Sequence, residues 1–115
     1  MICTASYTPD AAAHAFKSDV TNEVTGSNYT PGGVTLASKT LTFSSGTVTF
    51  GAADVAILQH ASGFTDGRIG VLYRSTGTDA TSVLVAYAAF GSDCGNVNGD
   101  LVVQQDAIGI LVAAP

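Results

Sequence analysis

The most reactive side chains in this chain belong to two histidines and two cysteines. His14 and His60 each stand alone in their local sequence, and a general base ordinarily needs a convergent titratable partner. Cys94 with His60 is one pair that could act as nucleophile and base, but no neighbouring residue supports it. We therefore expect both histidines to serve packing or hydrogen bonding, with a tertiary pairing of the two as the alternative.

The two cysteines differ in their surroundings. Cys3 follows Ile2 in an apolar opening, which indicates a small buried side chain. Cys94 lies in a polar loop. A disulfide between them stays open, although two free thiols are favoured for a protein made in the cytosol. No third or fourth ligand accompanies the pair, so a zinc site is not expected.

Oxygen-bearing side chains gather toward the end of the sequence, where a calcium site is conceivable. They are Asp93, Asn96, Asn98, Asp100 and Asp106. Their spacing lacks the alternating carboxylates and the final bidentate Glu of a calcium-binding loop. A polar turn is the favoured interpretation, and a structural cation is the alternative.

Phosphate and nucleic-acid chemistry are equally unsupported. The paired glycines at 32 and 33 do not belong to a phosphate-binding loop motif. The four basic residues are widely separated, so no basic patch for nucleic acid is expected. They are Lys17, Lys39, Arg68 and Arg74. The sequence thus predicts no catalytic, cofactor-binding or metal-binding residues, no cofactor, and a protein that is not an enzyme.

Aromatic residues offer one binding alternative. Tyr29 lies in the loop 28–33 and Phe64 in the loop 61–67, where exposed rings could form a carbohydrate- or receptor-binding module. Tyr73 and Tyr87 fall on two expected strands and are predicted to be cross-strand neighbours that pack within the core.

Composition favours assembly with other proteins. The chain has 115 residues, of which 46% are hydrophobic and 11% charged, with a formal net charge of −5. Typical domains carry about 25% charged residues, so this surface is rich in weakly hydrated groups that neighbouring proteins can bury. We expect one domain over residues 1–115, no signal peptide and no membrane segment.

Local patterns predict a mainly β fold. Residues 1–5 suggest a strand, and Thr8, Pro9 and Asp10 resemble the start of a short helix over residues 11–17. Residues 34–43 suggest a strand with a bulge or break near residues 38–39, because the apolar parity changes there. After a turn, residues 47–50 should place Val48 and Phe50 inward. We predict a single-domain antiparallel β-sandwich or barrel-like sheet with one short N-terminal helix.

Two strands should dominate this sheet. Residues 68–74 and 83–90 are apolar on both faces and are joined by a short loop, so they predict a central hairpin covered twice. Two short strands, 100–105 and 107–112, should follow. The second cover would come from the helix or from another subunit. A homo-oligomer is therefore expected, with a trimer as the first choice.

An ordered set of segments resembles a family of short structural proteins encoded in the virion gene clusters of tailed bacteriophages. The segments are 6–10 (SYTPD), 14–26 (HAFKSDVTNEVTG), 29–33 (YTPGG), 76–82 (TGTDATS), 86–87 (AY), 90–91 (FG), 98–100 (NGD), 105–107 (QDA) and 109–111 (GIL). Members usually begin further upstream, with a helical segment before the first strand, so Met1 falls within the expected first strand.

That resemblance implies a function in the virion. It favours a capsid decoration or cement protein that binds the major capsid protein, with a tail or head–tail structural protein as the alternative. It carries no catalytic residues. The expected location is the virion, assembled in the host cytoplasm.

Overall fold

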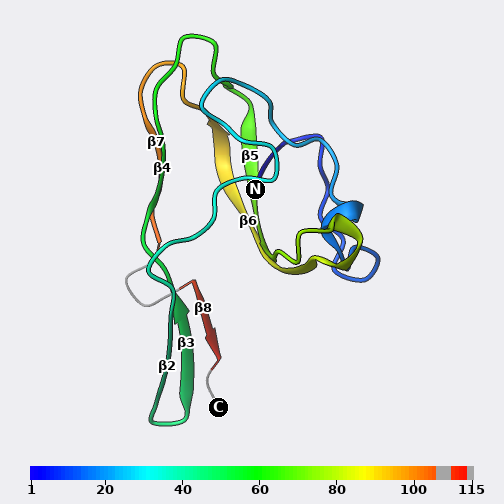
Figure 1. Ribbon diagram of the computed structural model, residues 1–115, viewed down its shortest axis with the longest axis vertical. Coiled ribbons are helices and arrows are strands. Elements are labelled where there is room, and N and C mark those ends of the chain that lie inside the picture. Colours follow the sequence, from blue (N-terminus) through cyan, green and yellow to red (C-terminus); the bar gives the residue numbers. More distant parts are fainter. Residues whose placement is uncertain (106–109, 114–115) are drawn as a thin grey trace.

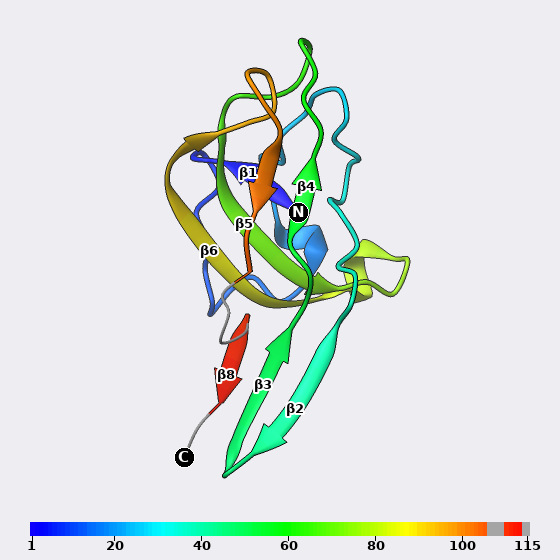
Figure 2. The same cartoon turned by 90° about the vertical axis from the view of Figure 1, so that its left-hand side faces the viewer.

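The computed structural model describes residues 1–105 and 110–113, which form three small antiparallel sheets (Figures 1 and 2). The sheet orders are β1-β5-β6, β2-β3-β8 and β4-β7. The strands are β1 (Ile2–Thr4), β2 (Thr40–Ser44), β3 (Thr47–Gly51), β4 (Val55–Ile57), β5 (Gly67–Arg74), β6 (Val83–Cys94), β7 (Leu101–Val103) and β8 (Leu111–Ala113). The chain is thus a single, mainly β domain, as predicted, and its described part contains no helix able to cross a membrane.

The central hairpin is formed by β5 and β6, which confirms the strongest sequence prediction. The strand β6 runs to Cys94 rather than ending at Phe90. Leu72 pairs with Ala86 and Tyr73 with Leu84, so Val85 is the extra residue of a β-bulge.

Side chains from both faces of this sheet enter small hydrophobic clusters. Ile2 and Cys3 are neighbours on β1 and point to opposite faces. The cluster on the Ile2 side contains Ile2, Val24, Tyr29, Ile57 and Phe64. The cluster on the Cys3 side contains Cys3, Tyr7, Ile69 and Val71. Loops of the same chain therefore cover much of both faces, as the doubly apolar strands require.

The predicted N-terminal helix over residues 11–17 is wrong. One helical turn closes when the His14 amide donates to the Asp10 carbonyl at 2.8 Å. The next amides then bind elsewhere: those of Ala15 and Phe16 donate to the Asp19 carboxylate, each at 2.9 Å. The chain joins the sheet edge through a bridge between Phe16 and Val83. Only the short 3-10 turns η1 (Lys17–Asp19) and η2 (Asp79–Thr81) form within the described residues.

The expected break in residues 34–43 is confirmed. Ser38 has a positive φ of 49°, and β2 begins only at Thr40. Ser45 and Gly46 then turn the chain with φ values of 50° and 81°. Positive φ at both central residues is the two-residue turn that suits the twist of a β-hairpin, and it joins β2 to β3.

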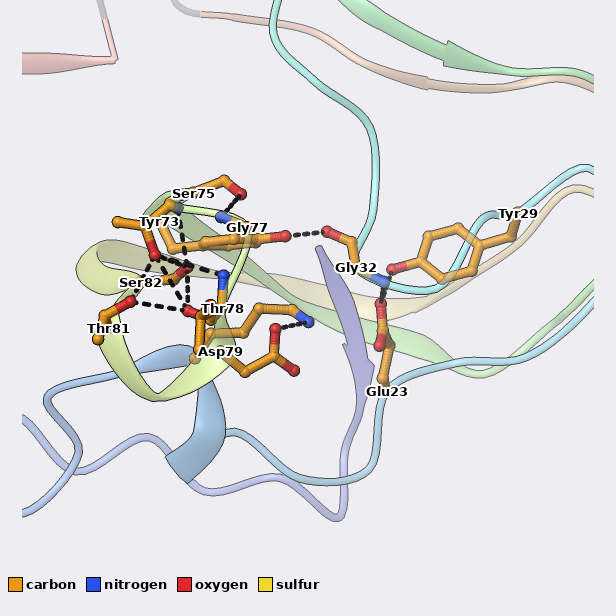
Figure 3. A network of polar contacts seen from close by, with 12 residues as sticks. Glu23, Tyr29, Gly32, Tyr73, Ser75, Gly77, Thr78, Asp79, Thr81 and Ser82 are labelled. Carbon is orange, nitrogen blue, oxygen red and sulfur yellow. Dashed lines mark hydrogen bonds and ion pairs between the residues drawn. The ribbon is translucent and has the colours of Figure 1, made fainter.

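A carboxylate ties the loop 29–33 to the central sheet (Figure 3). Glu23 Oε1 accepts hydrogen bonds from the Tyr29 hydroxyl and the Gly32 amide, both at 2.7 Å. The Tyr73 hydroxyl on β5 donates to the Gly32 carbonyl at 2.7 Å. The Ile2 amide donates to the Tyr29 oxygen at 2.9 Å. These residues therefore hold the fold together around the start of the chain.

Candidate functional site

The residues with reactive side chains are not brought together. His14 stacks on Tyr7 with ring centroids 5.6 Å apart. His60 Nδ1 accepts a hydrogen bond from the Ser62 amide at 3.0 Å. The Cys94 thiol donates to the Gly67 carbonyl at 3.1 Å. The histidines thus have separate structural partners, and neither the His14–His60 pair nor the Cys94–His60 pair forms.

Both cysteines are free thiols. Burial raises the pKa of Cys3 to about 11, and burial together with the Asp93 carboxylate raises the pKa of Cys94. Because the thiolate is the nucleophile, both residues are poor nucleophiles at neutral pH. A shallow hollow beside Cys94 has a volume of about 170 Å³, below the usual range for ligand pockets. It is lined by Thr65, Asp93, Cys94, Gly95, Val97 and Asn98.

The oxygen-rich segment does not assemble a cation site in its described part. Asp93 pairs with Arg68 at 2.8 Å, and Asp100 accepts a hydrogen bond from the Gln59 amide at 2.7 Å. Asp106 lies outside the described residues. Among residues 1–105 and 110–113, no group of three metal-ligating acidic, histidine or cysteine side chains occurs.

Asn96 has a structural role that the sequence did not reveal. Its side chain is fully buried and connects three loops. The side-chain oxygen accepts from the Phe64 amide at 3.0 Å, while the amide nitrogen donates to the Ser27 and Leu58 carbonyls at 3.0 and 2.8 Å. No local pattern indicates this role, because its partners come from distant parts of the chain.

The aromatic residues expected to be exposed are buried. Tyr29 and Phe64 are 8% and 3% exposed and pack edge to face with their centroids 5.5 Å apart. The feature that favoured a carbohydrate-binding surface is therefore wrong. Tyr73 and Tyr87 are not directly opposite each other, since Tyr73 pairs with Leu84 and Tyr87 with Val71.

The strongest surface feature is the hairpin of β2 and β3, which we call the arm. It extends away from the sheet β1-β5-β6, as both views show (Figures 1 and 2). Directly paired residues share one face of a sheet. The pairs Leu41–Phe50 and Phe43–Val48 therefore form one apolar face of the arm, which we call the arm face.

The opposite face of the arm is polar. It carries the pairs Thr42–Thr49 and Ser44–Thr47. Leu41 and Phe43 are each 73% exposed, and Val48 is also exposed. The prediction that Val48 points into the core is wrong: the alternation was read correctly, but the chain places no core beneath this face. The signal for the arm face was present in the spacing of Leu41, Phe43, Val48 and Phe50.

A second apolar surface lies on β6. Val83, Val85 and Tyr87 are 47%, 49% and 57% exposed, and we call them the β6 strip. Within the described residues, β6 pairs fully only with β5, while its other edge makes the single Phe16–Val83 bridge. Residues 83–92 contain no charge. An uncharged strand with a largely unpaired edge is a natural place for another chain to bind.

Comparisons of the chain with models of known protein families, with curated proteins and with solved structures found no match. The arm face and the β6 strip are therefore the features on which a functional argument rests.

Proposed function

We propose that this protein is a non-enzymatic structural subunit of a tailed-bacteriophage virion, acting as a decoration or cement protein on the capsid. The arm face carries the proposal, because it presents large apolar side chains outside the core of the chain. The partner is the major capsid protein, reached together with further copies of the same chain. The ordered segments that resemble phage structural proteins supply the virion context.

The energetic argument concerns burial. Leaving a large apolar side chain in water forgoes roughly 1.5–3 kcal/mol relative to burying it. Contiguous apolar patches on soluble proteins mark sites of contact with other proteins. A cement protein works by burying such surface across neighbouring shell subunits, so the arm supplies the kind of contact that this function needs.

The lack of charge on the arm supports tight packing. Residues 40–51 contain no Asp, Glu, Lys or Arg. Burying the arm therefore removes no ion from water, which would otherwise cost several kcal/mol for each unpaired charge. A neighbour that covers the arm face would form two packed layers, so the predicted sandwich would be completed by assembly.

Electron cryomicroscopy of the parent particle tests the proposal. We expect density for this chain on the outer capsid surface, between major capsid subunits. Density on the tail or at the head–tail connection would support the alternative position in the virion. Absence from the particle would reject a virion structural function.

A biochemical test uses shells that lack the protein. The purified wild-type chain should co-sediment with them, and L41T/F43T should not. A matched variant on the polar face of the arm, T42S, should bind like the wild type. Equal binding by wild type and L41T/F43T would remove the arm face from the capsid contact.

A further inference from the structure

The arm face and the β6 strip are two separate apolar surfaces that one chain cannot join. Figure 1 places the arm at one end of the molecule, away from β6, and Figure 2 agrees. The molecule extends 47 Å along its longest axis. A contact between these two surfaces must therefore involve two chains.

The exposed area favours a contact that uses both surfaces. An aromatic side chain buries roughly 150–250 Å², so the four residues of the arm face offer on the order of 400 Å². A standard interface buries about 800 Å² on each partner. Two arms packed against each other reach about half of that and leave the β6 strip in water. A head-to-tail contact lets each subunit bury both surfaces.

Charge and shape are compatible with this contact. Neither residues 40–51 nor residues 83–92 include a charged side chain, so the acidic chain meets no like-charge repulsion at the contact itself. The register of β2 on β3 has no bulge, which leaves a regular apolar surface. Sheets pack face to face through such surfaces.

We propose that the arm face of one copy packs on the β6 strip of a second copy, head to tail. This inference rests on the proposed structural function and names a second copy of the chain as the first partner of the arm. Repetition of the same contact closes a ring when the rotation between subunits permits. The ring would present the remaining surface of each subunit to the shell.

Complementation of two defective variants tests the contact. L41T/F43T removes the arm face, and V85T/Y87T removes the β6 strip. Thr keeps strand propensity, and circular dichroism confirms that each variant is folded. In sedimentation velocity the wild type should form oligomers, and each variant alone should be monomeric, with its self-association weakened roughly tenfold or more.

The mixture gives the decisive result. An equimolar mixture of the two variants retains one intact arm face and one intact β6 strip, so it should form a 1:1 heterodimer. If V85T/Y87T alone still self-associates like the wild type, the contact is arm to arm and the proposal is wrong. If the mixture stays monomeric, the proposal is also wrong. Neither result bears on whether the chain binds the capsid, which the shell assay measures separately.

A cross-link locates the contact. In a C94S background, the variants F43C and Y87C are mixed under mild oxidation, and a disulfide-linked heterodimer is expected. The matched control is T42C with Y87C, since Thr42 lies on the polar face of the arm. Equal cross-linking by F43C and T42C would show random collision and would overturn the proposed packing.

Discussion

Phe43 on β2 lies directly opposite Val48 on β3, so both side chains point to the face of the arm that has no core beneath it. L41T/F43T should therefore change the free energy of unfolding by less than about 1 kcal/mol, as expected for exposed positions. Urea denaturation of the dilute monomer measures this. Ile57→Ala, at a position 2% exposed, is the contrast and should lose about 2–5 kcal/mol. A comparable loss in L41T/F43T would show that the arm face packs within its own chain.

Asn96→Ala should destabilise the domain by about 2–4 kcal/mol. The substitution leaves the Phe64 amide and the Ser27 and Leu58 carbonyls without their buried partner. Chemical denaturation followed by circular dichroism measures the loss. Asn98→Ala, on an exposed residue of the same segment, should change stability by about 0.5 kcal/mol at most. Equal effects at both positions would contradict the role assigned to Asn96.

Gly63→Ala should be more harmful than Gly99→Ala. A Cβ at residue 63 would collide with Oδ1 of Asn96, whereas a Cβ at residue 99 meets open space. We expect a loss of about 1–3 kcal/mol for Gly63→Ala and little change for Gly99→Ala. Thermal melting of the two variants side by side checks the difference. A Gly63→Ala protein as stable as the wild type would mean that the Asn96 loop adjusts freely.

Glu23→Ala should detach the loop 29–33 from the central sheet. The Tyr29 hydroxyl and the Gly32 amide lose a shared charged acceptor, and hydrogen bonds to charged groups contribute about 1.5–3 kcal/mol each. Hydrogen exchange should show faster exchange at the Gly32 amide. Asp66→Ala alters an exposed carboxylate and serves as the control. Unchanged protection at Gly32 would show that the loop is held by other contacts.

Alkaline pH should weaken the fold through Cys3. Burial raises the pKa of this thiol from 9.0 to about 11, so the unfolded chain loses the proton first. Stability is then complete below pH 9 and falls as the pH rises toward 11, by up to about 2 kcal/mol. Urea denaturation across this range measures the slope. Cys3→Ala should make the slope shallower, while the tyrosines with raised pKa values, Tyr7 and Tyr29, retain their share. An identical slope in Cys3→Ala would exclude the thiol as a cause.

Several elements could be predicted from local sequence because their causes are local. The central hairpin follows from two apolar segments joined by a short polar loop, and the structure confirms it as β5 and β6. The break at Ser38 follows from a change in apolar parity, and the turn at Ser45 and Gly46 follows from residues that tolerate positive φ. Each of these features depends on residues within a few positions of one another.

Other features were decided by contacts between distant residues. The helix over residues 11–17 does not form because the Asp19 carboxylate and the edge of β6 satisfy the amides that would have continued it. Asn96 is buried because loops from three parts of the chain meet around it. The sequence alone determined that Leu41, Phe43, Val48 and Phe50 share one face. Only the tertiary structure decided that this face is exposed, because exposure depends on where the rest of the chain packs.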